Sequence, residues 1–239
     1  MFGLKKIAET SEHASSYYAA TANWQTNYAS LVDDVSADIV IVGGGFTGVN
    51  TAVELAERGY DVVLLEANRI SWGASGRNGG QIIGGVGHDA DRFEKKISRD
   101  GVEAIYKMGL EGPEIIRERV AKYQIDCDIK WGYCDVAIKP RHMKQFAQWK
   151  QWEQDQGNTN DLRLLEKDEL QQYVGAKKYL GGLYNAGNGH LHPLNLCIGE
   201  ARAAEKMGTR IYEQSRVVGI DQGARPVVRT EQGSVSAKR

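Results

Sequence analysis

Three consecutive glycines that directly follow an apolar segment constrain the fold of this chain most. Residues 38–42 read as a buried strand that leads into Gly43-Gly44-Gly45, and Gly48 follows three positions later. A second apolar run, residues 62–65, ends in Glu66, eighteen positions after Gly48. A strand, a glycine turn, a helix, a strand and an acid in this order are typical of a βαβ unit that binds a dinucleotide.

Each glycine of the turn has a separate physical role in such a unit. Gly43 permits a tight turn, Gly45 removes a side chain where the pyrophosphate approaches the backbone, and Gly48 lets the helix pack closely on the sheet. The free N–H groups and the positive dipole end of the helix then face the diphosphate. The helix has one apolar face and is expected to end at Gly59. That face consists of Val49, Ala52, Val53 and Ala56.

The segment after Glu66 favours FAD over NAD as the dinucleotide. The Glu66 carboxylate would repel the extra phosphate of NADP, so NADP is disfavoured. Residues 71–81 form a glycine-rich loop whose N–H groups, with Arg69 and Arg77, can surround an anion, and whose small residues admit a flat ring system. A flexible surface loop is the alternative. Because the loop follows Glu66 at once, we interpret it as a second cofactor contact, which a nicotinamide-only reductase would not need.

Six stretches spread over most of the chain resemble the D-amino-acid oxidase and glycine oxidase superfamily of FAD-dependent amine oxidoreductases. Within it, the resemblance is to the branch that oxidises gamma-glutamylputrescine. The fingerprint alone indicates only a dinucleotide fold, whereas the later stretches have no general structural reason to recur. The stretches are SSYYAA at 15–20, the fingerprint at 43–48, GASGRNGGQ at 73–81, EIIRER at 114–119, YQIDCD at 123–128 and GHLHPLNL at 189–196.

This resemblance implies a set of cofactor-binding residues. The diphosphate would be held by Gly43, Gly45, Phe46, Thr47 and Gly48, with help from Arg69 and Ser75. The adenosine ribose would bind Glu66, and the adenine would pair with the backbone of Val217 in the late strand 216–220, which is equally readable as a core strand. Asn78, Gly79, Gly80 and Gln81 would lie beside the isoalloxazine. Residues 66–81 contain no Cys or His, so noncovalent FAD is expected on this side.

The resemblance also implies a reaction. A hydride from the C–H next to an amine passes to flavin N5, the imine hydrolyses to an aldehyde and ammonia, and dioxygen reoxidises the flavin to give hydrogen peroxide. The cofactor carries the difficult step, so a dedicated acid or base is not required. We therefore name no catalytic residue. Oxidation of another small amine or D-amino acid, of the glycine or sarcosine type, is the alternative within the same class.

The fold class expected from these observations is α/β. It combines a Rossmann-like FAD-binding domain of the glutathione-reductase type, at 37–127 and 188–239, with an inserted antiparallel α+β substrate domain at 128–187, after an irregular N-terminal arm at 1–36. We expect helices at 91–123, with a break at Gly112-Pro113, at 142–156 and at 193–207. Short strands are expected at 134–138 and 182–184, and residues 210–220 return to the FAD-binding domain. Enzymes of this type are longer than 239 residues, so the chain is expected to be C-terminally truncated, either as a fragment or as a non-catalytic remnant.

Two histidines and four aromatic residues could have either a functional or a structural role. His190 and His192 would share one face of a strand, but no third metal ligand is evident, so we favour a structural role and expect no metal. Trp131, Tyr133, Trp149 and Trp152 could form an aromatic wall for a polyamine cation. Trp149 and Trp152 are three positions apart on a helix, which favours packing in a core instead.

Composition gives no indication of a nucleic acid or a membrane as partner. The chain has 30 basic and 31 acidic residues and a net charge of −1, which predicts neither a nucleic acid nor an anionic membrane as partner. No apolar run approaches the roughly 20 residues that span a bilayer. The N-terminus does not read as a secretory signal. Cys127, Cys134 and Cys197 lack paired spacing, which suits a reducing cytoplasm.

Overall fold

The computed structural model describes residues 11–85 and 93–238, which form two compact units. The first unit contains the residues up to Gly79, residues 119–127 and the residues from His192 onward, and the second contains residues 80–118 and 128–191. Residues 80–118 therefore pack with the middle of the chain and not with the glycine fingerprint. The functional division at 37–127, 128–187 and 188–239 stays a prediction.

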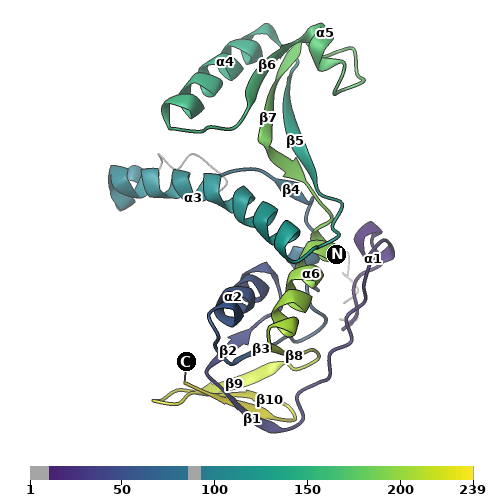
Figure 1. Ribbon diagram of the computed structural model, residues 1–239, viewed down its shortest axis with the longest axis vertical. Helices are drawn as coiled ribbons and strands as arrows, with labels where there is room; N and C mark the ends of the chain where they lie inside the picture. The colour runs from purple at the N-terminus through teal and green to yellow at the C-terminus, as the bar shows by residue number, and fades with distance from the viewer. Residues whose placement is uncertain (1–10, 86–92, 239) are drawn as a thin grey trace, which may run out of the picture. The chain divides into compact units, whose positions relative to one another are not determined.

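A three-stranded parallel sheet forms the centre of the first unit (Figure 1). Its strands are β2 (Ile39–Val42), β3 (Val62–Leu65) and β8 (Arg210–Tyr212), in the order β2-β3-β8. Helix α2 (Phe46–Glu57) connects β2 to β3, as the fingerprint predicts. This connection places the N-terminus of α2 at the carboxyl end of β2, where parallel sheets bind ligands.

The central strand β3 is apolar at every position because both faces of the sheet are covered. Val62 and Leu64 pack with α2 and with α6 (Pro193–Lys206). Val63 and Leu65 pack on the opposite face, against a cluster that includes Val228 and Val235. That cluster belongs to a second sheet, in the order β1-β11-β10-β9. Its strands are β1 (Asp34–Ala37), β9 (Val217–Asp221), β10 (Val227–Thr230) and β11 (Ser234–Ala237).

The described part of the N-terminal arm is more ordered than the sequence pattern predicts. Residues 1–10 of the expected arm lie outside the described residues. Helix α1 (Tyr17–Ala20) is capped by Ser16, and β1 pairs in parallel with β11, with Asp34 opposite Ser234. The expectation of an irregular segment was wrong there, because the partner that makes 34–37 a strand lies about two hundred positions later in the chain.

An antiparallel sheet forms the second unit, as expected. Its strands are β4 (Gln81–Ile82), β5 (Lys130–Ala137), β6 (Leu162–Glu166) and β7 (Gly181–His190), and β7 pairs with each of the other three. Helices α4 (Pro140–Asp155) and α5 (Lys167–Leu170) connect these strands. The sequence analysis missed β6 and predicted β7 too short.

Helix α3 (Glu94–Lys122) passes through Pro113 without the predicted break. A proline inside a helix leaves the carbonyl four residues earlier without its donor. That carbonyl belongs to Gly109, and it accepts a hydrogen bond from the N–H of Gly85 at 3.2 Å. The irregular position lies instead at Ser98, with φ 62° and ψ 171°. The prediction of a break at Gly112-Pro113 was wrong because a tertiary contact satisfies the freed carbonyl.

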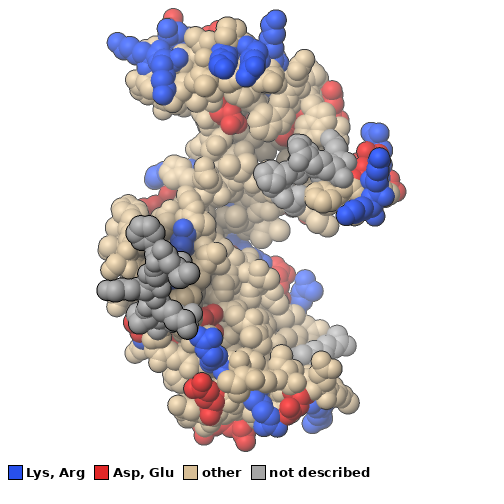
Figure 2. All heavy atoms as spheres, turned by 180° about the vertical axis from the view of Figure 1, so that it is seen from behind, with Lys and Arg blue, Asp and Glu red and all other residues tan. Residues whose placement is uncertain are grey.

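The surface carries both signs of charge. Figure 2 shows basic and acidic side chains interspersed over much of the face in view, in agreement with the near-zero net charge. Among the described residues, no helix combines the length and the apolar character that a membrane crossing requires.

Candidate functional site

The glycine turn between β2 and α2 brings the backbone of the fingerprint together. Gly43 has a φ of +104°, which an L side chain rarely adopts, and its N–H donates to the Leu65 carbonyl at 2.8 Å. A Cβ on Gly48 would lie 1.9 Å from the Gly43 carbonyl oxygen and 3.3 Å from Ile41 Cγ2. The helix can therefore start this close to the strand only because residue 48 has no side chain.

The N-terminus of α2 is capped from a distant loop. Gly45 occupies the N-cap position and offers no side chain, and the Phe46 N–H donates to Ser75 Oγ at 2.9 Å. Ser75 lies in a short 3₁₀ helix, η1 (Ala74–Gly76), inside the glycine-rich loop. A Cβ on Gly45 would lie 2.9 Å from the same Ser75 oxygen. Gly45, Phe46 and Ser75 thus meet at the dipole end of the helix, beside the exposed Thr47.

Glu66 lies against this turn, as a ribose-binding acid would. Its Oε2 accepts from the Gly44 N–H and its Oε1 from the Asn68 N–H, both at 2.7 Å. Gly44 is closely packed here, because a Cβ would lie 2.5 Å from Ile70 Cδ1, which would have to shift, and 3.1 Å from Glu66 Cβ. The sequence analysis did not include Gly44 among the site residues, although the triple glycine was the available signal.

The Arg69 guanidinium is paired with carboxylates of the described chain. It forms ion pairs with Glu12 at 2.8 Å and with Glu213 at 3.0 Å. These two carboxylates already compensate its charge, so the geometry gives no support to the predicted contact with the phosphates. That role for Arg69 stays a prediction.

Glu213 is a buried polar residue that the sequence analysis missed. Its side chain is 0% exposed and accepts four hydrogen bonds. Oε1 accepts from Thr26 Oγ1 and from the Ile70 N–H, and Oε2 accepts from the Tyr28 N–H and from Arg69. The donors come from the N-terminal arm and from the segment after β3. No local pattern could reveal this contact, since the donors lie more than 140 positions away.

The remaining predicted flavin contacts fall into both units. Asn78 donates to the carbonyls of Ala74 and Ser75, at 3.2 and 2.8 Å, and so holds the loop in a turn. Gly79 ends its segment of the first unit, whereas Gly80 and Gln81 belong to the second. Gln81 lies in β4, opposite His190. The positions of these residues beside an isoalloxazine stay predictions.

Val217 begins β9, which lies at the edge of its sheet. The segment between β8 and β9 lies beside Glu66, because the Ser215 N–H donates to the Glu66 carbonyl at 2.8 Å. Val217 also packs partly against the cluster on the far face of β3. The core reading of this residue is thus confirmed, and the adenine contact stays a prediction.

The contacts of His192 are those of a residue with a structural role, and His190 lies at the surface. His192 is buried and caps α6, where its Nδ1 accepts from the Asn195 N–H at 3.1 Å. The ring proton therefore lies on Nε2, which is 3.0 Å from Thr21 Oγ1, and Thr21 in turn donates to the Tyr17 carbonyl. His190 is exposed at the end of β7.

Two of the tryptophans differ from the expectation of core packing. Trp149 and Trp152 are 45% and 44% exposed. The Trp149 Nε1–H donates to Glu153 at 3.1 Å, and the Trp152 ring makes an edge contact with Tyr106. The expectation was wrong because α4 buries none of its residues fully.

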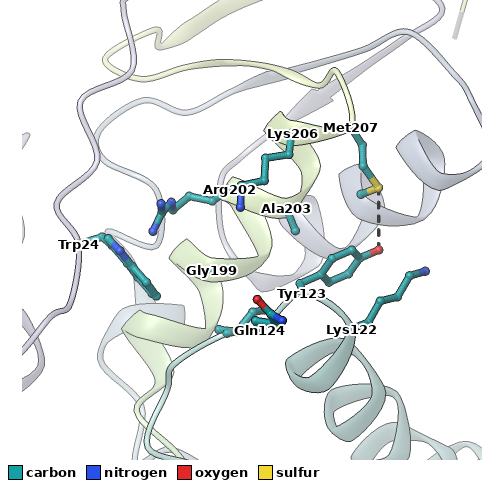
Figure 3. A pocket seen from close by; sticks show the side chains of 10 residues that line it. Trp24, Lys122, Tyr123, Gln124, Gly199, Arg202, Ala203, Lys206 and Met207 are labelled. Atoms are coloured by element: carbon teal, nitrogen blue, oxygen red, sulfur yellow. Dashed lines mark hydrogen bonds between the residues drawn. The ribbon is translucent and has the colours of Figure 1, made fainter.

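A hollow of about 370 Å³ in the first unit lies away from the fingerprint (Figure 3). It is lined by the C-terminal half of α6, by the end of α3 with the three residues that follow it, and by Trp24. Its cations have structural roles: Lys122 pairs with Glu57 at 2.6 Å, Arg202 stacks on the Trp24 ring, and Lys206 lies in the last turn of α6, where a cation complements the helix dipole. None of the fingerprint residues lines this hollow.

A buried polar network joins α2, α6 and the end of α3 in the first unit. Glu200 is 1% exposed and accepts from Asn50 Nδ2 at 2.9 Å. Arg119 lies 3.6 Å from Glu200 but makes its hydrogen bonds to Asn50 and Glu54. Burial raises the pKa of Glu200 to about 7, and Arg119 offsets this only in part.

The raised pKa makes stability depend on pH. Between about pH 4.5 and 7 the unfolded chain ionises at Glu200 while the folded chain keeps the proton, so stability falls as pH rises. We expect Glu200→Gln to remove this fall and to add about 1–3 kcal/mol to the free energy of unfolding at pH 8. Urea unfolding of the unmodified protein and of Glu200→Gln at pH 5 and pH 8 measures the pH dependence of the free energy of unfolding. Equal pH dependence in the two proteins would contradict the prediction, and Glu205→Gln, at an exposed position of the same helix, is the control.

The residues at the start of α2 fit the diphosphate of a dinucleotide. A left-handed Gly43, two glycines at which a Cβ would meet other atoms, and a helix N-terminus beside Glu66 together leave backbone rather than side chain facing the ligand. Gly44 and Glu213 also belong to this part of the structure and were not predicted from the sequence. The cofactor contacts predicted for the other residues, Arg69 included, stay predictions.

Several known proteins are similar to this chain over most of its length. The model of the family "FAD dependent oxidoreductase" (DAO) matches residues 38–239. Gamma-glutamylputrescine oxidoreductase of Escherichia coli K12 is 45% identical over 95% of the chain and 53% of its own length. The probable oxidoreductase OrdL of Haemophilus influenzae is 39% identical over 87% of the chain and 48% of its own length. The chain thus spans about half the length of these curated relatives.

Solved structures show the same fold. L-Amino acid deaminase from Proteus myxofaciens superposes with a TM-score of 0.75 at 23% identity, covering 92% of this chain and 47% of the deaminase. Glycine oxidase from Bacillus cereus superposes with a TM-score of 0.65 at 26% identity, covering 85% of this chain and 53% of the oxidase. The Rossmann-like fold with an antiparallel second part is therefore confirmed.

Proposed function

Because the chain belongs to the DAO family of FAD-dependent oxidoreductases, we propose that it binds FAD noncovalently at the start of α2 and oxidises the amine of gamma-glutamylputrescine. One amine, one dioxygen and one water would yield the aldehyde, ammonia and hydrogen peroxide. The observation that carries the proposal is the glycine cradle, in which Gly43, Gly45 and Gly48 leave backbone to face a diphosphate. The 45% identical relative supports the choice of substrate.

The residues of this chain would bind and orient the cofactor. The Phe46 and Thr47 N–H groups and Ser75 Oγ would face the diphosphate, and the Glu66 carboxylate would accept from the ribose hydroxyls. The η1 loop would hold Asn78 and Gly79 beside the flavin ring. When bound, FAD supplies the two-electron acceptor for the C–H next to the amine.

A second candidate substrate is a small secondary amine or a D-amino acid. The 26% identity to glycine oxidase from Bacillus cereus favours this class. Both candidates leave the cofactor site unchanged and differ only in the amine. Cys127, Cys134 and Cys197 lack paired spacing in the sequence, which supports a reducing compartment, and we take this to be the cytoplasm.

The visible absorption spectrum of the purified protein tests both parts of the proposal. We expect a flavin spectrum that is lost from the protein on acid or heat precipitation, since noncovalent FAD is released when the fold is destroyed. Anaerobic addition of gamma-glutamylputrescine should bleach it, and glycine or sarcosine should bleach it more slowly.

The outcomes distinguish a failure of the proposed cofactor binding from a failure of the proposed substrate. A protein that stays colourless after incubation with FAD contradicts the cofactor site, and flavin that remains with the precipitate contradicts noncovalent binding. A flavin spectrum that sarcosine bleaches faster replaces the proposed substrate by the second candidate. Bound flavin that no amine reduces contradicts the proposed activity for this chain.

A further inference from the structure

The second unit contains a cavity of its own, between its sheet and the two helices α3 and α4. Its volume is about 230 Å³, far more than a single water requires. All of its lining residues belong to the second unit, and none is part of the glycine fingerprint. The proposed cofactor site therefore does not explain it.

The floor of the cavity is one face of the antiparallel sheet. Tyr133 and Asp135 are two positions apart on β5 and so point to the same side. On β7 they lie opposite Asn185 and Leu183, which also line the cavity. A carboxylate thus occupies the inner face of a sheet, a place where an apolar residue is expected.

The Asp135 carboxylate has no partner within residues 11–85 and 93–238. No hydrogen bond or ion pair involves its side chain in this part of the structure. Burial raises the pKa of Asp135, and no neighbouring cation offsets the effect. A half-buried carboxylate is normally paired, because its desolvation otherwise goes uncompensated. The described chain therefore supplies no counterion for the Asp135 carboxylate.

The other acid of the cavity is already satisfied. Glu153 accepts from Tyr106 Oη at 2.5 Å and from Asn158 Nδ2 at 2.7 Å through one oxygen, and from Trp149 Nε1 through the other. These bonds position the rings of Tyr106 and Trp149 around the cavity. Among the described lining residues there is no Lys, Arg or His. The described walls of the cavity consequently contain acids and aromatic rings but no cation.

From this arrangement we propose that the cavity binds a small alkyl ammonium ion, with Asp135 as the acceptor of the ammonium group and the rings of Tyr106, Tyr133 and Trp149 around the aliphatic chain. Aromatic faces attract cations, and a carboxylate supplies the charge-assisted hydrogen bond. The site is separate from the proposed cofactor site. Only the choice of a diamine as probe rests on the proposed function.

Calorimetric titration of the FAD-loaded protein with putrescine, under anaerobic conditions, tests the proposal. We expect saturable binding that falls at least about tenfold in Asp135→Asn, because the amide keeps the shape and removes the charge. Asp161→Asn is the matched control, since Asp161 is exposed and pairs with Arg163 outside the cavity. 1,4-Butanediol, which has the same chain length without charge, should not bind.

Thermal unfolding, which does not use flavin reduction as its signal, provides the second measurement. Asp135→Asn should raise Tm in the absence of ligand, because it removes an uncompensated carboxylate, and putrescine should raise the Tm of the unmodified protein but not that of the variant. Unchanged affinity in Asp135→Asn, equal binding of the diol, or a lowered Tm of the ligand-free variant would each overturn the proposal. None of these results depends on flavin reduction, so failure of the proposed activity leaves this test interpretable.

Discussion

Replacing Glu213 by alanine is expected to lower the free energy of unfolding by about 3–5 kcal/mol, because it breaks a buried ion pair and leaves several donors unsatisfied. Thr26, Tyr28, Arg69 and Ile70 all donate to this carboxylate, whose side chain is 0% exposed. Urea unfolding followed by tryptophan fluorescence measures the loss. The N-terminal arm should also detach first, which hydrogen exchange at the Tyr28 amide reports.

The second carboxylate that binds Arg69, Glu12, provides an internal control for this prediction. Glu12 binds the same guanidinium but its side chain is 61% exposed, so solvent screens that pair. Glu12→Ala should therefore lower the free energy of unfolding much less than Glu213→Ala does. If the two variants unfold at the same urea concentration, the buried carboxylate is not the anchor of the arm. Glu213→Gln keeps the shape, and its stability should lie between that of the alanine variant and that of the unmodified protein.

Gly48→Ala is expected to weaken FAD binding by at least about tenfold and to lower stability by about 1–3 kcal/mol. The added Cβ would lie 1.9 Å from the Gly43 carbonyl oxygen, which belongs to the backbone and has no free rotamer. The first turn of α2 must then move away from the glycine turn, and its N–H groups no longer face the diphosphate. Flavin content after purification and titration of the apoprotein with FAD measure the effect.

The matched control is Gly112→Ala in α3. A Cβ there meets nothing within 4 Å, and the residue lies inside a helix. We expect unchanged FAD binding and a gain of about 0.5–1 kcal/mol in stability, because alanine is the better helix former. Gly48→Ala with full flavin content would contradict the role assigned to this glycine.

Local patterns were sufficient for the elements around the cofactor site. The apolar face of α2 follows Val49, Ala52, Val53 and Ala56, all of which are buried. The positive φ of Gly43 was also predictable, because a tight strand-to-helix turn requires a residue without Cβ. In each case the relevant atoms lie within one βαβ unit, so short-range spacing contains the information.

Long-range partners account for what the sequence analysis missed. Pro113 does not break α3 because Gly85 donates to the carbonyl that the proline leaves free. Arg69 turns to Glu12 and Glu213 because the arm and the segment after β8 both reach it. Trp149 stays half exposed because its indole N–H bonds Glu153 at the cavity wall. No periodicity encodes such contacts.

By itself, the sequence determined the dinucleotide fingerprint, the apolar run that becomes β3 and the family, because each is recognised from residue types at short spacings within a stretch of chain. Only the tertiary structure decided which carboxylates are paired. Glu213 meets four donors from two distant segments, whereas Asp135, on the inner face of an antiparallel sheet, meets none in the described chain. The physical reason is that desolvation and pairing depend on what surrounds a charge in space, and chain folding sets those surroundings.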